Sequence, residues 1–274
     1  MFNSVSLNTC AVGTKVVSVE QDQKLTATLL YPSGPVRNRP LVALHGISRD
    51  ARALADHFAP EADAAGRVII VPRFARKHWP VFQRITHRHR PDRALLALVA
   101  DLRLRNVITS EAFDLFGFSG GAQLAHRFAM LHPEHVADLH LGAAGWYTLP
   151  DASMPYPMGL GPSTRGDDRW GRRMASGLAA YLDRRIVLYV GGLDDDPNDP
   201  ALRRKPELDM AQGTTRLVRA RRYAEAIRDL QLKNGVPATC ALHELPGCSH
   251  DFADCAENGG LTAFAARPAA EKLN

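Results

Sequence analysis

The feature that most constrains this chain is a glycine-rich corner around Ser119, where an apolar run ends and a helical pattern begins. Residues 112–116 have the composition of a short buried strand, and apolar side chains recur from Gln123 to Leu131 with the spacing of one helix face. Between them stands the pattern Gly-x-Ser-x-Gly, with glycines at 117 and 121. A strand-to-helix turn this tight leaves almost no room for neighbouring side chains. The pattern therefore predicts a strand, a sharp turn and a helix in close contact.

Ser119 on this corner has the surroundings that a nucleophile needs. Its hydroxyl would lie at the N-terminus of the helix, where unpaired N–H groups and the helix dipole stabilise negative charge on a bound carbonyl. An alkyl hydroxyl is a weak nucleophile at neutral pH, so it requires a base, and the base requires a carboxylate to orient it. A glycine-rich turn with one serine also occurs by chance. The rest of the chain must therefore supply both partners.

The corner around Ser119 resembles the nucleophile turn of the α/β-hydrolase arrangement, in which the acid and then the histidine follow on loops after later strands. This resemblance implies that the carboxylate comes after the strand-like run 184–190, which leads into Gly-Gly-Leu-Asp-Asp-Asp. Asp194 is the preferred acid because it is the first carboxylate beyond the strand. Asp195 and Asp196 stay open as alternatives. Together with Asp199, the same segment also has the composition of a solvated acidic turn or of a cation-binding loop.

The base is expected among the two histidines that follow this acid, His243 and His250. His243 lies in the strand-like run 239–245, whose side chains alternate between faces, and a histidine there is more often structural. His250 stands in the turn directly after that run, from which a side chain can reach across the strand ends. His250 is therefore the predicted base.

Two backbone N–H groups are expected to stabilise negative charge on a substrate carbonyl oxygen. One is that of Gly120, which follows the serine. The other is that of Ile47, in the loop after the apolar strand 40–44, because the preceding Gly46 lets the backbone turn this N–H inward. For His45, at the start of the loop, we expect a structural role rather than proton transfer.

In these four segments the chain resembles the α/β-hydrolase superfamily, and the resemblance extends over almost the whole length. The segments fall in the family's order of oxyanion loop, nucleophile elbow, acid and base: Leu44-His-Gly46, Gly117-Phe-Ser-Gly-Gly121, Gly191-Gly-Leu-Asp194 and Gly247-Cys-Ser-His250. Within the superfamily the chain is most similar to single-domain carboxylesterases related to poly(3-hydroxybutyrate) depolymerases and feruloyl esterases. Many members of that group are secreted and carry a substrate-binding module, features not visible in this sequence.

The resemblance implies a serine hydrolase that cleaves carboxylic esters through an acyl-enzyme intermediate, with a triad of Ser119, His250 and Asp194. The same triad would serve an amide hydrolase, a thioester hydrolase or an acyltransferase, because only the substrate or the acyl acceptor differs. Outside enzymes, the alternative is a non-catalytic binding protein of the same fold. Such proteins usually lack a triad member, and all three are present here.

Length and patterning favour one α/β domain over residues 1–274. A chain of this length with 45% hydrophobic residues can bury one large core. From about residue 50 onward, strand-like runs alternate with helical patterns, which predicts an α/β-hydrolase fold with a mostly parallel central sheet of about eight strands and helices on both faces. An antiparallel N-terminal hairpin would form its edge. The strand-like runs lie at 15–20, 25–31, 41–44, 68–72, 113–116, 139–143, 186–190 and 239–245.

A short lid-like insertion at about 144–183 is expected to shape the substrate site. It is too short for a full helical cap domain. The predicted pocket residues in it are Trp146, Tyr147 and Tyr156, whose rings would line an acyl or alcohol pocket or else pack the lid onto the core.

The net charge of +5 and pI of about 9.2 raise the question of nucleic-acid binding. The arginine cluster between residues 73 and 93 lacks any nucleic-acid-binding motif, and clustered charge is usually a solvated face. We therefore expect a small-molecule or oligomeric ester as substrate, with no nucleic acid and no membrane as partners, and we leave a homodimer open. No cofactor and no metal are expected.

The location is expected to be cytoplasmic, because neither a secretory signal nor a membrane span is evident. The four cysteines show no metal-ligand spacing. Cys248 and Cys255 flank His250 and would form a bridge only in an oxidising compartment, so free thiols are expected.

Overall fold

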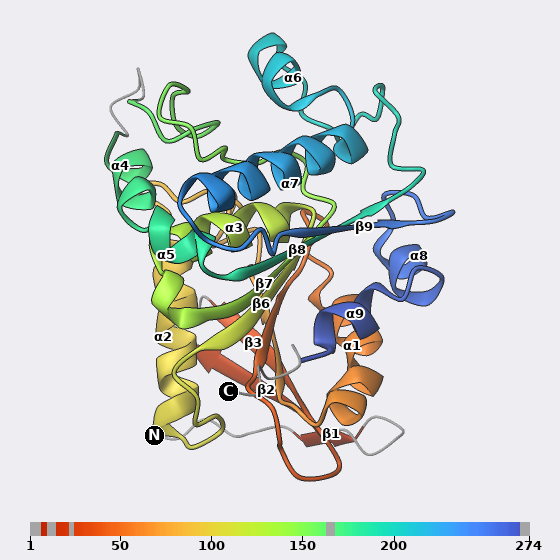
Figure 1. Ribbon diagram of the computed structural model, residues 1–274. Coiled ribbons are helices and arrows are strands. Elements are labelled where there is room, and N and C mark those ends of the chain that lie inside the picture. Colours follow the sequence, from red (N-terminus) through yellow and green to blue (C-terminus); the bar gives the residue numbers. More distant parts are fainter. Residues whose placement is uncertain (1–6, 10–14, 22–24, 163–167, 269–274) are drawn as a thin grey trace.

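The computed structural model describes residues 7–9, 15–21, 25–162 and 168–268 (Figure 1). Its strands within these ranges are β1 (Leu7–Thr9), β2 (Lys15–Gln21), β3 (Leu25–Tyr31), β4 (Leu41–Leu44), β5 (Ile69–Arg73), β6 (Phe113–Phe118), β7 (Val136–Gly142), β8 (Arg185–Gly191) and β9 (Ala241–Leu245). These nine strands of the described chain form one sheet in the order β1-β2-β3-β5-β4-β6-β7-β8-β9. The strands from β1 to β3 and on to β5 pair antiparallel, and the pairs from β5 to β9 are parallel. The predicted α/β-hydrolase sheet with an antiparallel edge is confirmed, with one strand more than the eight expected.

Helices cover both faces of this sheet. They are α1 (Ala51–Ala65), α2 (Pro91–Leu104), α3 (Gly120–Leu131), α4 (Asp168–Ser176), α5 (Leu178–Leu182), α6 (Pro206–Gln212), α7 (Arg216–Lys233), α8 (Phe252–Glu257) and α9 (Leu261–Ala266). One layer contains α1, α8 and α9, which gather at the right of Figure 1, and the other contains α2, α3, α5 and α7. Among the described helices, none combines the length and apolar character needed to cross a membrane.

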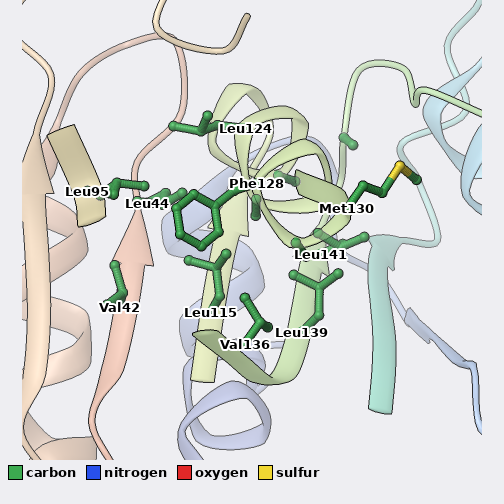
Figure 2. Close-up of a cluster of buried hydrophobic side chains, with 14 of the residues drawn as sticks. Val42, Leu44, Leu95, Leu115, Leu124, Phe128, Met130, Val136, Leu139 and Leu141 are labelled. Carbon is green, nitrogen blue, oxygen red and sulfur yellow. The ribbon is translucent and has the colours of Figure 1, made fainter. Parts of the chain in front are cut away.

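Two separate cores lie under the helical layers, and both take side chains from β3, β4, β5, β6 and β8. In β4, Leu41 and Ala43 pack in the core under α1, whereas Val42 and Leu44 pack in the core under α3. This is the two-residue period of a strand buried on both faces, and it explains why the run is apolar throughout. Figure 2 shows the core under α3, where Phe128 lies above Leu115 of β6.

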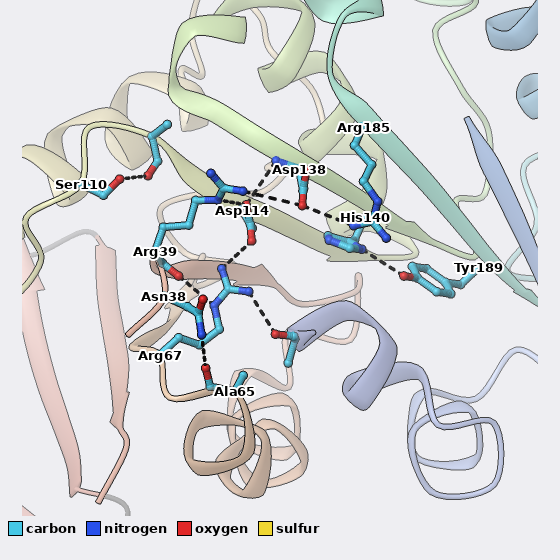
Figure 3. A network of polar contacts seen from close by, with 12 residues as sticks. Asn38, Arg39, Ala65, Arg67, Ser110, Asp114, Asp138, His140, Arg185 and Tyr189 are labelled. Atoms are coloured by element: carbon cyan, nitrogen blue, oxygen red, sulfur yellow. Dashed lines mark hydrogen bonds and ion pairs between the residues drawn. The ribbon is translucent and has the colours of Figure 1, made fainter. Parts of the chain in front are cut away.

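A buried ion network closes the amino end of the sheet (Figure 3). The guanidinium of Arg67 is fully buried and donates to Asp114 Oδ2 at 2.6 Å and to the carbonyl oxygens of Arg39 and Ala266. Arg39 donates to the other oxygen of Asp114 at 2.8 Å. Buried charges are tolerated when they are paired and hydrogen-bonded in this way. The network therefore ties α9 to the sheet at the end away from Ser119.

Candidate active site

Ser119 occupies a strained corner between β6 and α3. Its backbone has φ 52° and ψ −112°, a conformation that residues other than glycine rarely adopt. A Cβ on Gly117 would lie 2.4 Å from the backbone of Gly121, and a Cβ on Gly121 would lie 2.3 Å from the carbonyl oxygen of Leu44. Both positions therefore require glycine, which is the physical basis of the sequence pattern.

His250 and Asp194 form a chain of hydrogen bonds with this serine. His250 Nε2 lies 3.1 Å from Ser119 Oγ, and His250 Nδ1 lies 2.8 Å from Asp194 Oδ2. Because a carboxylate can only accept, Nδ1 carries the proton and the neutral ring leaves Nε2 to accept from the serine hydroxyl. The ring also stacks on Phe118, with centroids 5.4 Å apart. The arrangement is chemically capable of moving the hydroxyl proton to the histidine.

The two aspartates next to Asp194 make other contacts. Asp195 accepts a hydrogen bond from Thr215 Oγ1 at 2.7 Å, and Asp196 accepts one from the backbone N–H of Asn198 at 2.8 Å. Of the three consecutive aspartates, all within the described chain, Asp194 alone contacts His250.

The turns that carry the acid and the base are hydrogen-bonded to each other. The backbone N–H of Gly192 donates to Leu245 at 2.8 Å, and that of Leu193 donates to Cys248 at 2.9 Å. A Cβ on Gly191 would lie 2.3 Å from the carbonyl oxygen of Cys248, so this close approach also requires glycine. Cys248 and Cys255 are buried free thiols in this region. The parallel register of β8 and β9 thus brings the two turns to the same sheet end.

Arg216, at the start of α7, lies beside the acid. The side chain is 2% exposed, and its Nη1 donates to Asp194 Oδ1 at 3.1 Å and also to Asp199 Oδ2. The guanidinium therefore pairs with two of the four aspartates of the acidic loop, whose composition is also compatible with a bound cation. The sequence signal for it is a row of arginines after that loop, at positions 216, 219 and 222.

The backbone nitrogen of Ile47 lies close to Gly120, the residue after the serine. The nitrogen of Ile47 would lie 3.3 Å from a Cβ built on Gly120. Neither N–H has a hydrogen-bond partner among the residues that the structure describes. The two predicted donors are therefore adjacent and free to bind an oxygen.

His45 holds the loop that carries Ile47. Its Nε2 accepts from the backbone N–H of Phe74 at 3.0 Å, and its Nδ1 donates to the carbonyl oxygen of Gly46 at 2.8 Å. Burial lowers the pKa of His45 to about 4, so the ring is neutral at physiological pH. These contacts agree with the structural role expected for His45.

A cavity of about 390 Å³ opens beside Ser119 and His250. Its apolar walls include Phe118 and the first turns of α1 and α8. Charged side chains on its lining are Asp50, Asp251 and Arg216. The cavity is large enough for a small ligand, since such pockets usually span about 300–1,000 Å³.

The structure does not bring the three predicted aromatic pocket residues to this cavity. Trp146, Tyr147 and Tyr156 are 4%, 0% and 7% exposed. Tyr147 stacks on Tyr223 of α7 with centroids 4.1 Å apart, and the hydroxyl of Tyr156 donates to the carbonyl oxygen of Ile85 at 2.9 Å. In the described part of the predicted lid, these rings pack onto the core instead.

The comparisons with known proteins agree with this geometry. No protein-family model matches the chain, and no curated protein matches its sequence. Among solved structures, LpqC, a poly(3-hydroxybutyrate) depolymerase from Bordetella parapertussis, is 26% identical with a TM-score of 0.73, over 95% of this chain and 92% of that one. Poly(aspartic acid) hydrolase-1 from Sphingomonas sp. KT-1 is 23% identical with a TM-score of 0.73, over 96% of each chain.

A more distant structural match has the same fold. An S-formylglutathione hydrolase from Agrobacterium tumefaciens is 14% identical with a TM-score of 0.62, over 96% of each chain. A likeness at this identity supports the fold alone. Taken with the match to LpqC, these similarities identify the chain as a hydrolytic enzyme of the α/β-hydrolase fold.

Proposed function

We propose that the protein is a serine esterase that cleaves carboxylic esters through an acyl-enzyme intermediate. Ser119 is the nucleophile, His250 the general base and Asp194 the acid that orients the histidine. The observation that carries this proposal is the chain of hydrogen bonds from Ser119 Oγ to His250 at 3.1 Å and from His250 to Asp194 at 2.8 Å, at the edge of a cavity.

The reaction uses each of these groups in turn. His250 Nε2 takes the proton from Ser119 as its oxygen attacks the ester carbonyl carbon, and the carboxylate of Asp194 stabilises the imidazolium that forms. The carbonyl oxygen becomes an oxyanion between the N–H groups of Ile47 and Gly120. His250 then donates its proton to the alcohol, which leaves, and water releases the acyl group by the same steps.

The names of the similar structures support an ester substrate and define the alternatives. Poly(3-hydroxybutyrate), named for LpqC, is an ester-linked polymer, whereas poly(aspartic acid) is amide-linked and S-formylglutathione is a thioester. All three bonds react through an acyl-enzyme, so only the relative rates separate them. We propose a small or oligomeric ester because the chain has its highest identity of the three, 26%, with the ester hydrolase.

The test compares p-nitrophenyl butyrate with the butyryl thioester and the butyryl anilide on the purified protein. The ester should be turned over fastest, and mass spectrometry of a rapidly quenched reaction should find a butyryl group on Ser119. The Ser119→Ala variant should lose activity by about 10⁴-fold or more, as expected when a nucleophile is removed. The matched control is Ser110→Ala, since Ser110 precedes β6 at the opposite end of the same strand. Near wild-type turnover in Ser119→Ala would overturn the proposal.

A further inference from the structure

The cavity beside Ser119 is lined by His250 and by the loop 45–48. Part of its wall is the segment from His250 to Ala253, which leads from the base into the first turn of α8. Another part is the first turn of α1, with Leu54. The cavity is therefore bounded by the group that would hand a proton to the leaving alcohol.

The chemistry of the proposed reaction assigns this space to one part of the substrate. The alcohol oxygen must accept its proton from His250 Nε2, so the alcohol has to extend past the imidazole ring. The oxyanion points to the two free N–H groups, and the acyl substituent takes the remaining bond of the tetrahedral carbon. The wall formed by residues 250–253 begins at this proton donor, so the reaction assigns it to the alcohol rather than to the acyl group.

The inner surface of the cavity is mainly apolar. Phe118 and Leu54 are almost fully buried, and Phe252 is half-buried at the start of α8. Apolar surface of this kind favours an aliphatic or aromatic group, because burying it removes apolar area from water.

The charges on the cavity lining are predominantly negative. Asp50 and Asp251 are exposed, and each caps a helix by accepting a backbone hydrogen bond, from Ala53 at 2.9 Å and from Asp254 at 2.8 Å. Neither carboxylate forms an ion pair within the described part of the chain. The cation on the described lining, Arg216, is occupied by the carboxylates of two other aspartates.

This local charge is opposite to that of the chain as a whole, which carries +5. We propose that the cavity is the binding site for the alcohol part of the ester, and that it takes an apolar alcohol that is neutral or cationic and disfavours one that carries a carboxylate. The inference rests on the proposed function, because it names the substrate class of that same site. A carboxylate about 7 Å from one like charge in water binds about threefold more weakly, so two aspartates should disfavour it by about tenfold.

The test uses three butyrate esters that differ only in the alcohol. The alcohols are 1-pentanol, which is neutral, choline, which is cationic, and 5-hydroxypentanoate, which is anionic. We expect kcat/KM for the pentyl ester to exceed that for the anionic ester by about tenfold in low salt, and kcat/KM for the choline ester to exceed it by more, because the same two charges attract a cation. In 1 M NaCl the Debye length falls to about 3 Å, and this difference should largely disappear. An anionic ester hydrolysed as well as the neutral one in low salt would overturn the inference.

Variants that remove one charge test whether Asp50 and Asp251 cause the discrimination against the anionic ester. Asparagine caps a helix about as well as aspartate, so Asp50→Asn and Asp251→Asn remove charge and keep the caps. Each should raise the ratio of kcat/KM for the anionic ester to that for the neutral ester by about threefold. Glu111→Gln, which removes an exposed carboxylate at the amino end of β6, should leave this ratio unchanged.

The outcomes separate this inference from the function on which it rests. A ratio that stays the same in both asparagine variants would overturn the charge argument while ester hydrolysis stands. No hydrolysis of any of the three esters, or full activity in Ser119→Ala, would overturn the proposed function and the inference with it.

Discussion

Replacing Asp194 by asparagine should abolish most activity, and the contact with Arg216 determines the reason. Arg216 can only donate, and its Nη1 lies 3.1 Å from Asp194 Oδ1. The carbonyl oxygen of an asparagine would therefore face Arg216, and its NH₂ group would face His250 Nδ1, where Oδ2 now lies at 2.8 Å. The histidine would have to accept at Nδ1 and carry its proton on Nε2. In that tautomer it cannot take the proton of Ser119.

The magnitude follows from the loss of the correct tautomer. A change of this kind in a Ser-His-Asp triad lowers kcat by about 10⁴-fold, which is about 5 kcal/mol in the activation barrier. KM should change little, because the cavity and the free N–H groups of Ile47 and Gly120 are not altered. The control is Asp195→Asn, since Asp195 bonds Thr215 and should tolerate an amide.

A second substitution tests whether Arg216 controls the orientation of the amide. Arg216→Met removes the donor, so the amide of Asp194→Asn could rotate and present its oxygen to His250. The double variant should therefore be at least about tenfold more active than Asp194→Asn alone, although Arg216→Met by itself should cost about 3–5 kcal/mol of stability by leaving carboxylates unpaired. Measurements of kcat and KM with p-nitrophenyl butyrate, with circular dichroism to verify folding, decide the matter. If the loss of kcat in the double variant equals the product of the losses in the two single variants, the argument from amide orientation is wrong.

Three further perturbations test the histidines and the elbow. His250→Ala should lower kcat in an esterase assay by orders of magnitude, because His250 contacts Ser119. His243→Ala should change kcat little, because its ring stacks on Tyr189 away from the serine. The opposite pair of results would refute the assignment of His250 as the base. Gly121→Ala should lower Tm by several degrees because its Cβ would lie 2.3 Å from a carbonyl oxygen, and an unchanged Tm would contradict this. Burial lowers the pKa of His140 to about 3. The unfolded chain binds a proton below about pH 6.5 whereas the folded chain does not, so stability is lost as pH falls from 6.5 towards 3. In urea unfolding between pH 7 and pH 5, the free energy of unfolding of the wild type should fall by about 2 kcal/mol more than that of His140→Leu. An equal fall in both proteins would show that burial of neutral His140 is not the cause.

The sheet could be predicted because its strands carry their own signal. The parallel strands β4, β5 and β8 are buried on both faces, so their sequences are short, continuous apolar runs bounded by polar residues and glycine. The strand Leu7–Thr9 was not predicted, because three residues, two of them polar, contain no such pattern. It is defined by pairing with β2, which is a property of the folded edge and not of the segment itself.

The positions of Ser119, Asp194 and His250 could be predicted from the order of the strands. Parallel strands direct their carboxyl ends to one edge, so residues directly after β6, β8 and β9 must converge there. The sequence does not show which of the preceding aspartates Arg216 contacts, because the contact depends on how the start of α7 packs against the loop after β8. The same limit applies to Trp146, since aromatic residues after a strand have the same pattern whether they line a pocket or pack a core. In the structure its ring lies against the guanidinium of Arg127, 4.4 Å from the ring centroid.

The contacts at the start of α7 also predict that a substitution outside the cavity lowers kcat. Besides Arg216, the backbone N–H of Leu217 donates to the carbonyl oxygen of Asp194 at 3.1 Å. Thr215 fixes this helix end, since its hydroxyl accepts from Val218 at 3.3 Å and donates to Asp195 at 2.7 Å. The acid is therefore held in position by a helix N-terminus whose cap lies outside the cavity.

Thr215→Val removes both of these hydrogen bonds at nearly constant volume. Loss of an N-cap costs about 1–2 kcal/mol of stability, and loosening the helix end should displace the carboxylate that orients His250. We expect kcat to fall about three- to tenfold with little change in KM, because small displacements of a catalytic group are costly. Thr262→Val is the matched control, since its hydroxyl bonds Glu61 towards the C-terminal end of α1, whereas the first turn of that helix lines the cavity. If both valine variants lowered kcat equally, the effect would be one of general stability, and the helix end would have no part in positioning the acid.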